Sequence, residues 1–259
     1  MMKKTLICLL AAGCLSLLGE LQAALFHRIS EDGVRIMSYN IRNGNGMDNR
    51  HDVGRVAARI TESGADLVAL QEVDSLTHRS GDTYIAGQLA DLTGLHATYA
   101  PAIDFDGGKY GIALLSREKP LSFYQVPLPG REEKRTLMVV EFKDYVILNT
   151  HFSLTEADQL VSVDILVREA RKVTGKPVFL AGDFNSTPDS AVQKQLSRYF
   201  ECLTSPDWVT CDGACIDFIF RYRTKGTDKK NTSVRCVERR LVPDDIASDH
   251  RPVWVDMKY

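Results

Sequence analysis

Short apolar runs alternate with amphipathic segments along most of the chain. Apolar runs of this length are typical of buried strands, and they occur at residues 34–40, 66–70, 112–115, 121–126, 136–142, 145–148, 178–181, 216–220 and 252–255. Apolar residues at helical spacing predict helices over 52–63, 83–93 and 157–174. Gly64 and Gly94 would close the first two helices. The glycine-rich stretch 107–111 is expected to be a flexible turn.

The composition is that of a globular protein with one substantial core. The chain has 259 residues, of which 44% are hydrophobic and 25% are charged. It contains no Pro/Gly/Ser linker, low-complexity tract or fixed-period repeat. A single domain over residues 24–259 is therefore the simplest organisation.

The first 23 residues have the pattern of a secretory signal. Lys3 and Lys4 precede an apolar stretch, and small residues lie near Ala23. The stretch is shorter than the ~20 residues that span a membrane. We expect cleavage after Ala23 and export to the periplasm or the extracellular space. Lipid attachment at Cys14 is the alternative, although apolar residues rather than a polar tether follow that cysteine.

Charge and cysteine content limit the partners. The formal net charge is −2, and removing two Lys and one Glu with residues 1–23 makes it −3. A mildly acidic protein has no general electrostatic attraction for nucleic acid, and no obligate protein partner is evident. An oxidising compartment makes one or two disulfides plausible, with the pairing open, among Cys202, Cys211, Cys215 and Cys236. Zinc at Cys211 and Cys215 is the weaker alternative.

Polar side chains follow or begin several of the predicted strands. Carboxylate, carboxamide and imidazole groups recur there at Asn40, Glu72, His151, Asp183, Asn185, Asp217, Asp249 and His250. Each position alone could be an ordinary turn or cap residue. Together they form an oxygen-rich set that suits Mg²⁺ or Mn²⁺ better than zinc. Two histidines could neutralise a phosphoryl group, so the pattern fits metal-assisted hydrolysis of a phosphate ester.

An ordered series of motifs carries a family resemblance. The motifs are SYNIR, DLVALQEVD, KYGIALLSR, NTHFS, AGDFNSTP, IDFIF and SDHRPV, and they cover nearly the whole chain after residue 23. Together they resemble the endonuclease/exonuclease/phosphatase superfamily of magnesium-dependent phosphoesterases, which includes deoxyribonuclease I. The resemblance implies an α/β fold in which two packed mixed β-sheets are flanked by helices.

The resemblance also implies a role for each motif residue. Glu72 would be the main Mg²⁺ ligand, with Asn40 beside it and Asp249 near the metal. Asp183 would orient or activate water, and Asn185 would hold the phosphate near the leaving group. His250 would contact the scissile phosphate, with Asp217 fixing its tautomer and charge. Contacts with phosphate oxygens are implied for His151, Tyr110 and Arg135.

The substrate is the least determined part of the prediction. The negative net charge and the lack of a basic-aromatic tract favour a small phosphoester or a lipid-head-group phosphodiester over DNA. A secreted endonuclease acting on DNA or RNA is the alternative. A non-catalytic binding module is disfavoured because Glu72, Asp183 and His250 are all present.

Overall fold

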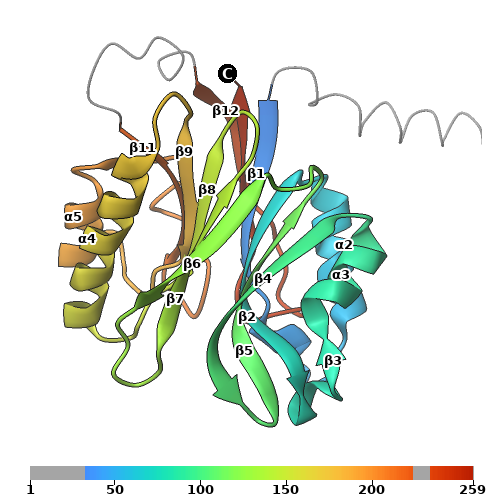
Figure 1. The fold of residues 1–259 in the computed structure, drawn as a ribbon. Helices are drawn as coiled ribbons and strands as arrows, with labels where there is room; N and C mark the ends of the chain where they lie inside the picture. The colour runs from blue at the N-terminus through green and yellow to red at the C-terminus, as the bar shows by residue number, and fades with distance from the viewer. Residues whose placement is uncertain (1–32, 224–233, 259) are drawn as a thin grey trace, which may run out of the picture.

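The chain folds into two β-sheets that pack face to face, with helices on both outer faces (Figure 1). The computed structural model describes residues 33–223 and 234–258. The predicted signal segment lies outside these residues, so it stays a prediction, as does the domain boundary at residue 24. Within the described ranges, none of the helices is both long and apolar enough to cross a membrane.

The first sheet has seven strands in the order β12-β13-β1-β2-β5-β4, with β3 paired to β2. Its strands are β1 (Gly33–Asn40), β2 (Leu67–Thr77), β3 (Thr83–Tyr84), β4 (His96–Phe105), β5 (Gly108–Ser116), β12 (Arg235–Leu241) and β13 (Val253–Lys258). β1 and β2 are parallel, and the other neighbouring pairs are antiparallel. Its outer face is covered by α2 (Val53–Ser63) and α3 (Ile85–Thr93).

The second sheet has six strands in the order β10-β11-β9-β8-β7-β6. Its strands are β6 (Ser122–Leu128), β7 (Arg135–Glu141), β8 (Val146–His151), β9 (Val178–Asp183), β10 (Phe200–Cys202) and β11 (Asp217–Tyr222). Only β8 and β9 are parallel to each other. Helices α4 (Glu156–Lys172) and α5 (Ala191–Leu196) cover its outer face. The predicted α/β fold with two mixed sheets flanked by helices is confirmed.

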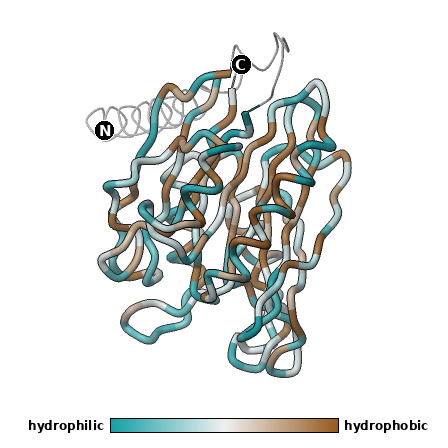
Figure 2. Tube along the Cα trace, turned by 90° about the vertical axis from the view of Figure 1, so that its left-hand side faces the viewer, coloured by the Kyte–Doolittle hydropathy of each residue, from teal (hydrophilic) through white to brown (hydrophobic). Residues whose placement is uncertain are grey.

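The hydrophobic core lies in three layers. The inner layer between the sheets contains Ile36, Leu114, Ile147, Phe179 and Ile219, all almost fully buried. The two outer layers lie between each sheet and its helices. Figure 2 shows the apolar residues concentrated along the interior strands. Burying one such side chain stabilises the fold by about 1.5–3 kcal/mol, so the strand ends are held on a rigid scaffold.

The predicted helix over 52–63 illustrates how local sequence sets an element. Asp52 caps α2 by accepting a hydrogen bond from the Arg55 backbone N–H at 3.3 Å. Val56 and Ile60 lie on the buried face, and Gly64 ends the helix in the left-handed conformation at φ 63°. The helices predicted over 83–93 and 157–174 are also present, as α3 and α4.

Two predictions about local structure were wrong. The stretch 107–111 is not a flexible turn throughout, because β5 begins at Gly108 and Gly111 lies within it. A Cβ atom at Gly111 would lie 2.2 Å from the Ala100 carbonyl oxygen, so the glycine there permits close approach of β4. The expected disulfides are absent from the described residues, where Cys202, Cys211, Cys215 and Cys236 are free thiols. Cys211 forms a β-bridge with His250, whereas Cys236 lies on edge strand β12.

Candidate active site

Asp183, the last residue of β9, lies at the centre of a polar cluster at one end of the two sheets. The parallel register pairs it with His151 of β8, and the antiparallel register pairs it with Asp217 of β11. Asn40, at the end of β1 in the other sheet, donates from Nδ2 to Asp183 Oδ2 at 3.0 Å. The strand ends of both sheets therefore converge on one carboxylate.

Glu72 reaches this cluster through an irregularity in β2. The pairing of β2 with β5 shifts between Leu70 and Val73, and Glu72 has a φ of 58°. Such a bulge redirects a side chain out of the regular alternation of a strand. Glu72 Oε1 accepts a hydrogen bond from Asn40 Nδ2 at 3.0 Å. The strand was expected to end at Glu72; instead it continues to Thr77, and the bulge rather than the strand end presents the carboxylate.

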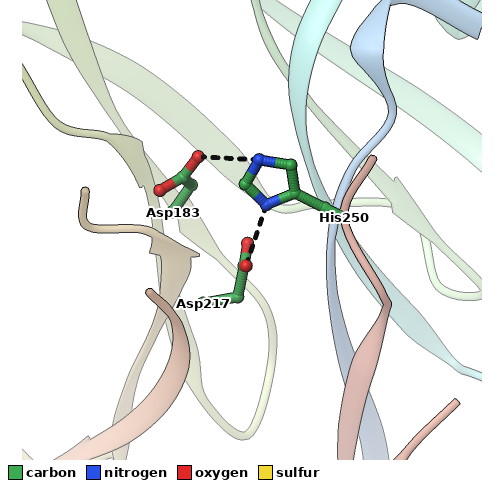
Figure 3. Close-up of side chains that lie close together, drawn as sticks. All are labelled: Asp183, Asp217 and His250. Atoms are coloured by element: carbon green, nitrogen blue, oxygen red, sulfur yellow. Dashed lines mark hydrogen bonds and ion pairs between the residues drawn. The ribbon is translucent and has the colours of Figure 1, made fainter. Parts of the chain in front are cut away.

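His250 and Asp217 form a buried hydrogen-bonded pair (Figure 3). His250 Nδ1 lies 2.9 Å from Asp217 Oδ2, and His250 Nε2 lies 3.7 Å from Asp183 Oδ2. Burial alone would lower the pKa of His250, but the charge and hydrogen bond of Asp217 and the nearby Asp183 raise that pKa to about 12. The raised pKa favours the imidazolium form of His250 near neutral pH, in which both ring nitrogens carry a proton.

Neighbouring groups shift the pKa of Asp183 in opposite directions. Burial and the charge of Asp217 raise the pKa of Asp183 to about 7, while the charge of His250 and hydrogen bonds to the carboxylate oppose the shift. One of these bonds comes from the Asn185 backbone N–H to Asp183 Oδ1 at 2.9 Å. A carboxyl group with a pKa near neutrality is suited to accepting and releasing a proton.

His151 differs from His250 in charge. Its Nε2 lies 3.4 Å from Asp183 Oδ2, and its Nδ1 lies 3.0 Å from NH1 of Arg135. Burial, the Arg135 guanidinium and the charge of His250 hold the pKa of His151 well below its usual range. The pKa values of the two histidines beside Asp183 are therefore shifted in opposite directions, which favours a neutral His151 and a charged His250.

The remaining predicted residues lie around this centre. Asn185, at φ 47°, donates from Nδ2 to the Phe152 carbonyl at 3.0 Å, so its amide nitrogen is already engaged. Asp249 is more exposed and lies 3.7 Å from Arg42 Nε. Tyr110 is buried, and its hydroxyl has a raised pKa because of burial and the nearby Glu72. All of these roles remain predictions.

Three further residues support the site and were not predicted from the sequence. Ser248 Oγ donates to the Asn40 carbonyl at 2.8 Å and so connects two motifs. Arg79 binds the buried Asp74 through two contacts of 2.7 Å and lies over the Tyr110 ring at 5.4 Å. Glu133 lies 3.0 Å from Arg135 NH1. Ser248 is in the SDH motif, and this motif was the only sequence signal for any of the three. Arg79 lies in a short 3-10 helix (His78–Ser80) and Glu133 in the loop before β7, and neither segment has a periodic pattern.

The donor atoms allow a test of which residues fit a divalent metal ion. Asp183, Asp217 and His250 form a group whose potential ligand atoms lie within 4.8 Å of one another. His250 is a poor ligand because its Nδ1 is bonded to Asp217 and its raised pKa favours the protonated form, whereas ligating groups must be deprotonated. Glu72 fits better, because among the described residues its carboxylate accepts a hydrogen bond only from Asn40. Asn40 presents Nδ2 to Glu72, while its Oδ1 accepts from the Arg42 N–H at 3.1 Å.

The fold thus gathers two carboxylates and two imidazoles at one end of its packed sheets. Residues 37–250 match the model of the Endonuclease/Exonuclease/phosphatase family. The chain therefore belongs to this family, whose members are metal-dependent phosphoester hydrolases. The predicted family and enzyme class are confirmed.

Solved structures of low sequence identity share the fold. A family member from Bacteroides vulgatus is 21% identical with a TM-score of 0.70, covering 88% of this chain and 99% of its own. A mannosyl-6-phosphatase from Bacteroides thetaiotaomicron is 16% identical with a TM-score of 0.67, covering 87% of this chain and 100% of its own. The human Nocturnin catalytic domain with bound sulfate is 19% identical with a TM-score of 0.66, covering 88% and 93%. None of the curated proteins matches the sequence.

Proposed function

We propose that this protein is an exported, Mg²⁺-dependent phosphoesterase that hydrolyses a small phosphoester or a lipid-head-group phosphodiester. The observation that carries the proposal is the convergence of three side-chain nitrogen atoms on Asp183 Oδ2. Asn40 Nδ2 lies 3.0 Å from this oxygen, His151 Nε2 lies 3.4 Å from it, and His250 Nε2 lies 3.7 Å from it. A phosphate bound beside Asp183 would meet the same donors.

The choice of magnesium follows from ligand chemistry. Glu72, with Asn40 and Asp249 nearby, would hold the ion, because carboxylate and amide oxygens are the ligands that Mg²⁺ prefers. Mn²⁺ would be able to substitute. When bound, the ion would supply charge stabilisation for the phosphoryl group and would lower the pKa of a bound water.

The side chains around Asp183 would divide the remaining work. Asp183 would orient the attacking water and accept its proton, for which a pKa of about 7 is well matched. His250 would donate a charged hydrogen bond from Nε2 to a phosphate oxygen, and Asp217 would keep the imidazolium oriented. Asn40 and the Asn185 backbone N–H would fix the Asp183 carboxylate in place.

The preference for a small substrate rests on charge. The net charge is −2, and Arg135 is bound to His151 rather than exposed on a basic surface. A basic surface is the usual electrostatic requirement for duplex binding. A secreted nuclease remains the second candidate, and export itself rests on the N-terminal sequence pattern alone.

A substrate panel tests the proposal. The purified protein would be assayed with Mg²⁺ or Mn²⁺ against sugar phosphates, inositol phosphates, sphingomyelin, RNA and plasmid DNA. Asp183→Asn serves as the matched control, since it keeps the side-chain volume and shows whether an activity belongs to this site. The proposal would be supported if the wild type hydrolysed a small or lipid phosphoester and the Asp183→Asn variant did not. Activity confined to nucleic acid would select the nuclease, and a panel without turnover would count against both.

A further inference from the structure

Arg135 is buried behind His151, on the side of the imidazole that faces away from Asp183. The guanidinium NH1 lies 3.0 Å from His151 Nδ1 and 3.0 Å from Glu133 Oε1. Arg135 is 8% exposed, and the Glu133 side chain is 29% exposed. A chain of contacts therefore runs from Glu133 through Arg135 and His151 to Asp183.

The chemistry of arginine determines where the His151 proton lies. A guanidinium has only donor N–H groups and remains protonated at any relevant pH. In the contact with Arg135, His151 Nδ1 must therefore accept, so it carries no proton. A neutral imidazole has one proton, and that proton must be on Nε2. The Nε2–H group lies on the side of Asp183 Oδ2, 3.4 Å away.

We infer that Glu133 and Arg135 are positioning residues that hold His151 as a neutral imidazole with its proton on Nε2. Glu133 balances the charge of the guanidinium as its ion-pair partner, and the guanidinium keeps Nδ1 unprotonated. His151 is thereby a hydrogen-bond donor toward the reacting phosphate and cannot be the general base at Nε2. The two histidines are thus held at Nδ1 by partners of opposite charge, His250 by the Asp217 carboxylate and His151 by the Arg135 guanidinium.

The loop before β7 places Glu133 beside Arg135. A Cβ atom at Gly130 would lie 1.8 Å from the Glu133 carbonyl oxygen, so the chain can fold back here only because residue 130 is glycine. Arg131, in the same loop, instead pairs with Asp158 at 3.0 Å, and its side chain is 63% exposed. Arg131 therefore offers a matched control for the removal of an arginine from this loop.

Nitrogen NMR of the histidine rings tests the tautomer directly. Long-range ¹H–¹⁵N correlation spectra of the ¹⁵N-labelled, metal-free protein at pH 7 distinguish a protonated from an unprotonated ring nitrogen. A His151→Asn variant would assign the His151 signals. We expect an unprotonated Nδ1 and a protonated Nε2 in the wild type. A proton on His151 Nδ1 in the wild type would overturn the inference.

Variants of Arg135 and Glu133 test the cause. Arg135→Met removes the donor, and we expect a tautomer with a proton on His151 Nδ1 to become populated because no donor then faces that nitrogen. Arg135→Lys, which keeps a cationic donor, should retain the wild-type pattern, as should Arg131→Gln. A Glu133→Gln/Arg135→Met double variant avoids leaving the half-buried Glu133 carboxylate unpaired. An unprotonated Nδ1 in both the Arg135→Met single and double variants would show that Arg135 does not set the tautomer.

The turnover of the Arg135 variants gives a second test, and this test rests on the proposed function. Removing one preorganised donor typically costs ~10²–10³-fold in turnover. We expect a loss of this order in kcat for Arg135→Met and a substantially smaller loss for Arg135→Lys. The NMR result does not depend on the substrate, so failure of the inference and failure of the proposed function are distinguishable. Equal losses in the Met and Lys variants would contradict the positioning role.

Discussion

The Nδ1 atom of His250 lies 2.9 Å from Asp217 Oδ2, and both side chains are buried. The carboxylate raises the pKa of the imidazole against the opposing effect of burial. Asp217 thus has the same relation to His250 that the carboxylate has to the histidine of a serine protease triad. The pair is expected to act as one unit in catalysis.

Substitution of Asp217 by Asn should lower turnover while preserving the fold. The amide keeps the shape of the carboxylate but removes the charge that stabilises the imidazolium. General acid–base assistance is typically worth ~10²–10⁴-fold, and we expect a loss in that range, with His250→Ala at least as severe. The double variant should be little worse than His250→Ala, because residues that act as a unit are not additive. Steady-state kinetics of the two single variants and the double variant measure this, and fully multiplicative losses would separate the two residues.

The raised pKa of Asp183 predicts a pH-dependent cost in stability. The folded-state pKa is about 7 and the ordinary value is 3.8, so the folded protein binds this proton more tightly than the unfolded chain does. The contribution to stability is complete below pH 3.8 and is lost as the pH rises toward 7. Asp183→Asn cannot ionise at this position. Its free energy of unfolding relative to the wild type should therefore increase between pH 4 and 7.

Urea denaturation in EDTA at several pH values measures this difference. EDTA is needed because a bound cation would favour the ionised carboxylate. Asp189→Asn is a matched control, because Asp189 is exposed and hydrogen-bonded to Thr187. A stability difference between Asp183→Asn and the wild type that stays constant from pH 4 to 7 would show that Asp183 does not have a raised pKa.

The strand ends were the most predictable part of the site. A short apolar run that stops at Asp183 or His151 indicates both the strand and the polar residue that follows it, because buried strands exclude polar side chains from their middle. The register that brings Asp217 opposite Asp183 is not visible in sequence, since it depends on which strands become neighbours. The recurrence of the pattern predicted the cluster, and the sheet topology determined the distances within it.

Other parts of the fold and of the site could not be predicted from the sequence, and the physical reason can be given for each. The bulge at Glu72 depends on the pairing of β2 with β5, which local sequence does not specify. The edge strand β12 carries mostly exposed polar side chains, so it lacks the apolar alternation by which strands are recognised. Glu133 contacts Arg135 from the loop before β7, and Arg79 contacts Tyr110, which is distant in the chain, so neither contact follows a helical or strand period.

Gly182, directly before Asp183, should be intolerant of a side chain. A Cβ atom at this position would lie 2.2 Å from the Thr150 carbonyl oxygen of the neighbouring strand. Gly182→Ala should therefore push β8 and β9 apart, with a loss of about 1–3 kcal/mol in the free energy of unfolding. Activity should fall as well, because the His151–Asp183 contact spans the same two strands. Denaturant unfolding and turnover measure the two effects.

Gly54 provides the comparison for this substitution. It is exposed in the first turn of α2, and a Cβ atom there would approach only the flexible Asp52 side chain, at 3.0 Å. Gly54→Ala should be neutral or stabilising by up to about 1 kcal/mol. If the two alanine variants were equally stable, the close approach at Gly182 would not constrain the sheet.

Export predicts a defined N-terminus. If residues 1–23 are a signal peptide, the protein recovered from the exported fraction begins at Ala24 and carries no lipid. Intact-mass spectrometry of that fraction measures both the position of the N-terminus and the presence of a lipid. Cys14→Ser should leave export unchanged, since Cys14 would lie within the removed segment. A diacyl adduct on Cys14 would instead assign the protein to the lipoprotein pathway.

Chelation and substitution of Glu72 test the metal assignment. EDTA should abolish activity, and Mg²⁺ or Mn²⁺ should restore it while Zn²⁺ restores it poorly, because the ligand set is rich in oxygen. Glu72→Gln keeps an oxygen that can accept a hydrogen bond from Asn40 but removes the charge, so it should raise the Mg²⁺ concentration needed for half-maximal activity.

Two further variants serve as controls for Glu72→Gln. Asp217→Asn should leave the half-maximal Mg²⁺ concentration unchanged, because Asp217 is hydrogen-bonded to His250. Asp48→Asn is the acidic control, since Asp48 is held in a surface ion pair with Arg55 at 2.9 Å. Magnesium titrations of the wild type and these three variants measure the effect, and full activity in EDTA, or equal titrations for Glu72→Gln and Asp48→Asn, would remove Glu72 from the metal site.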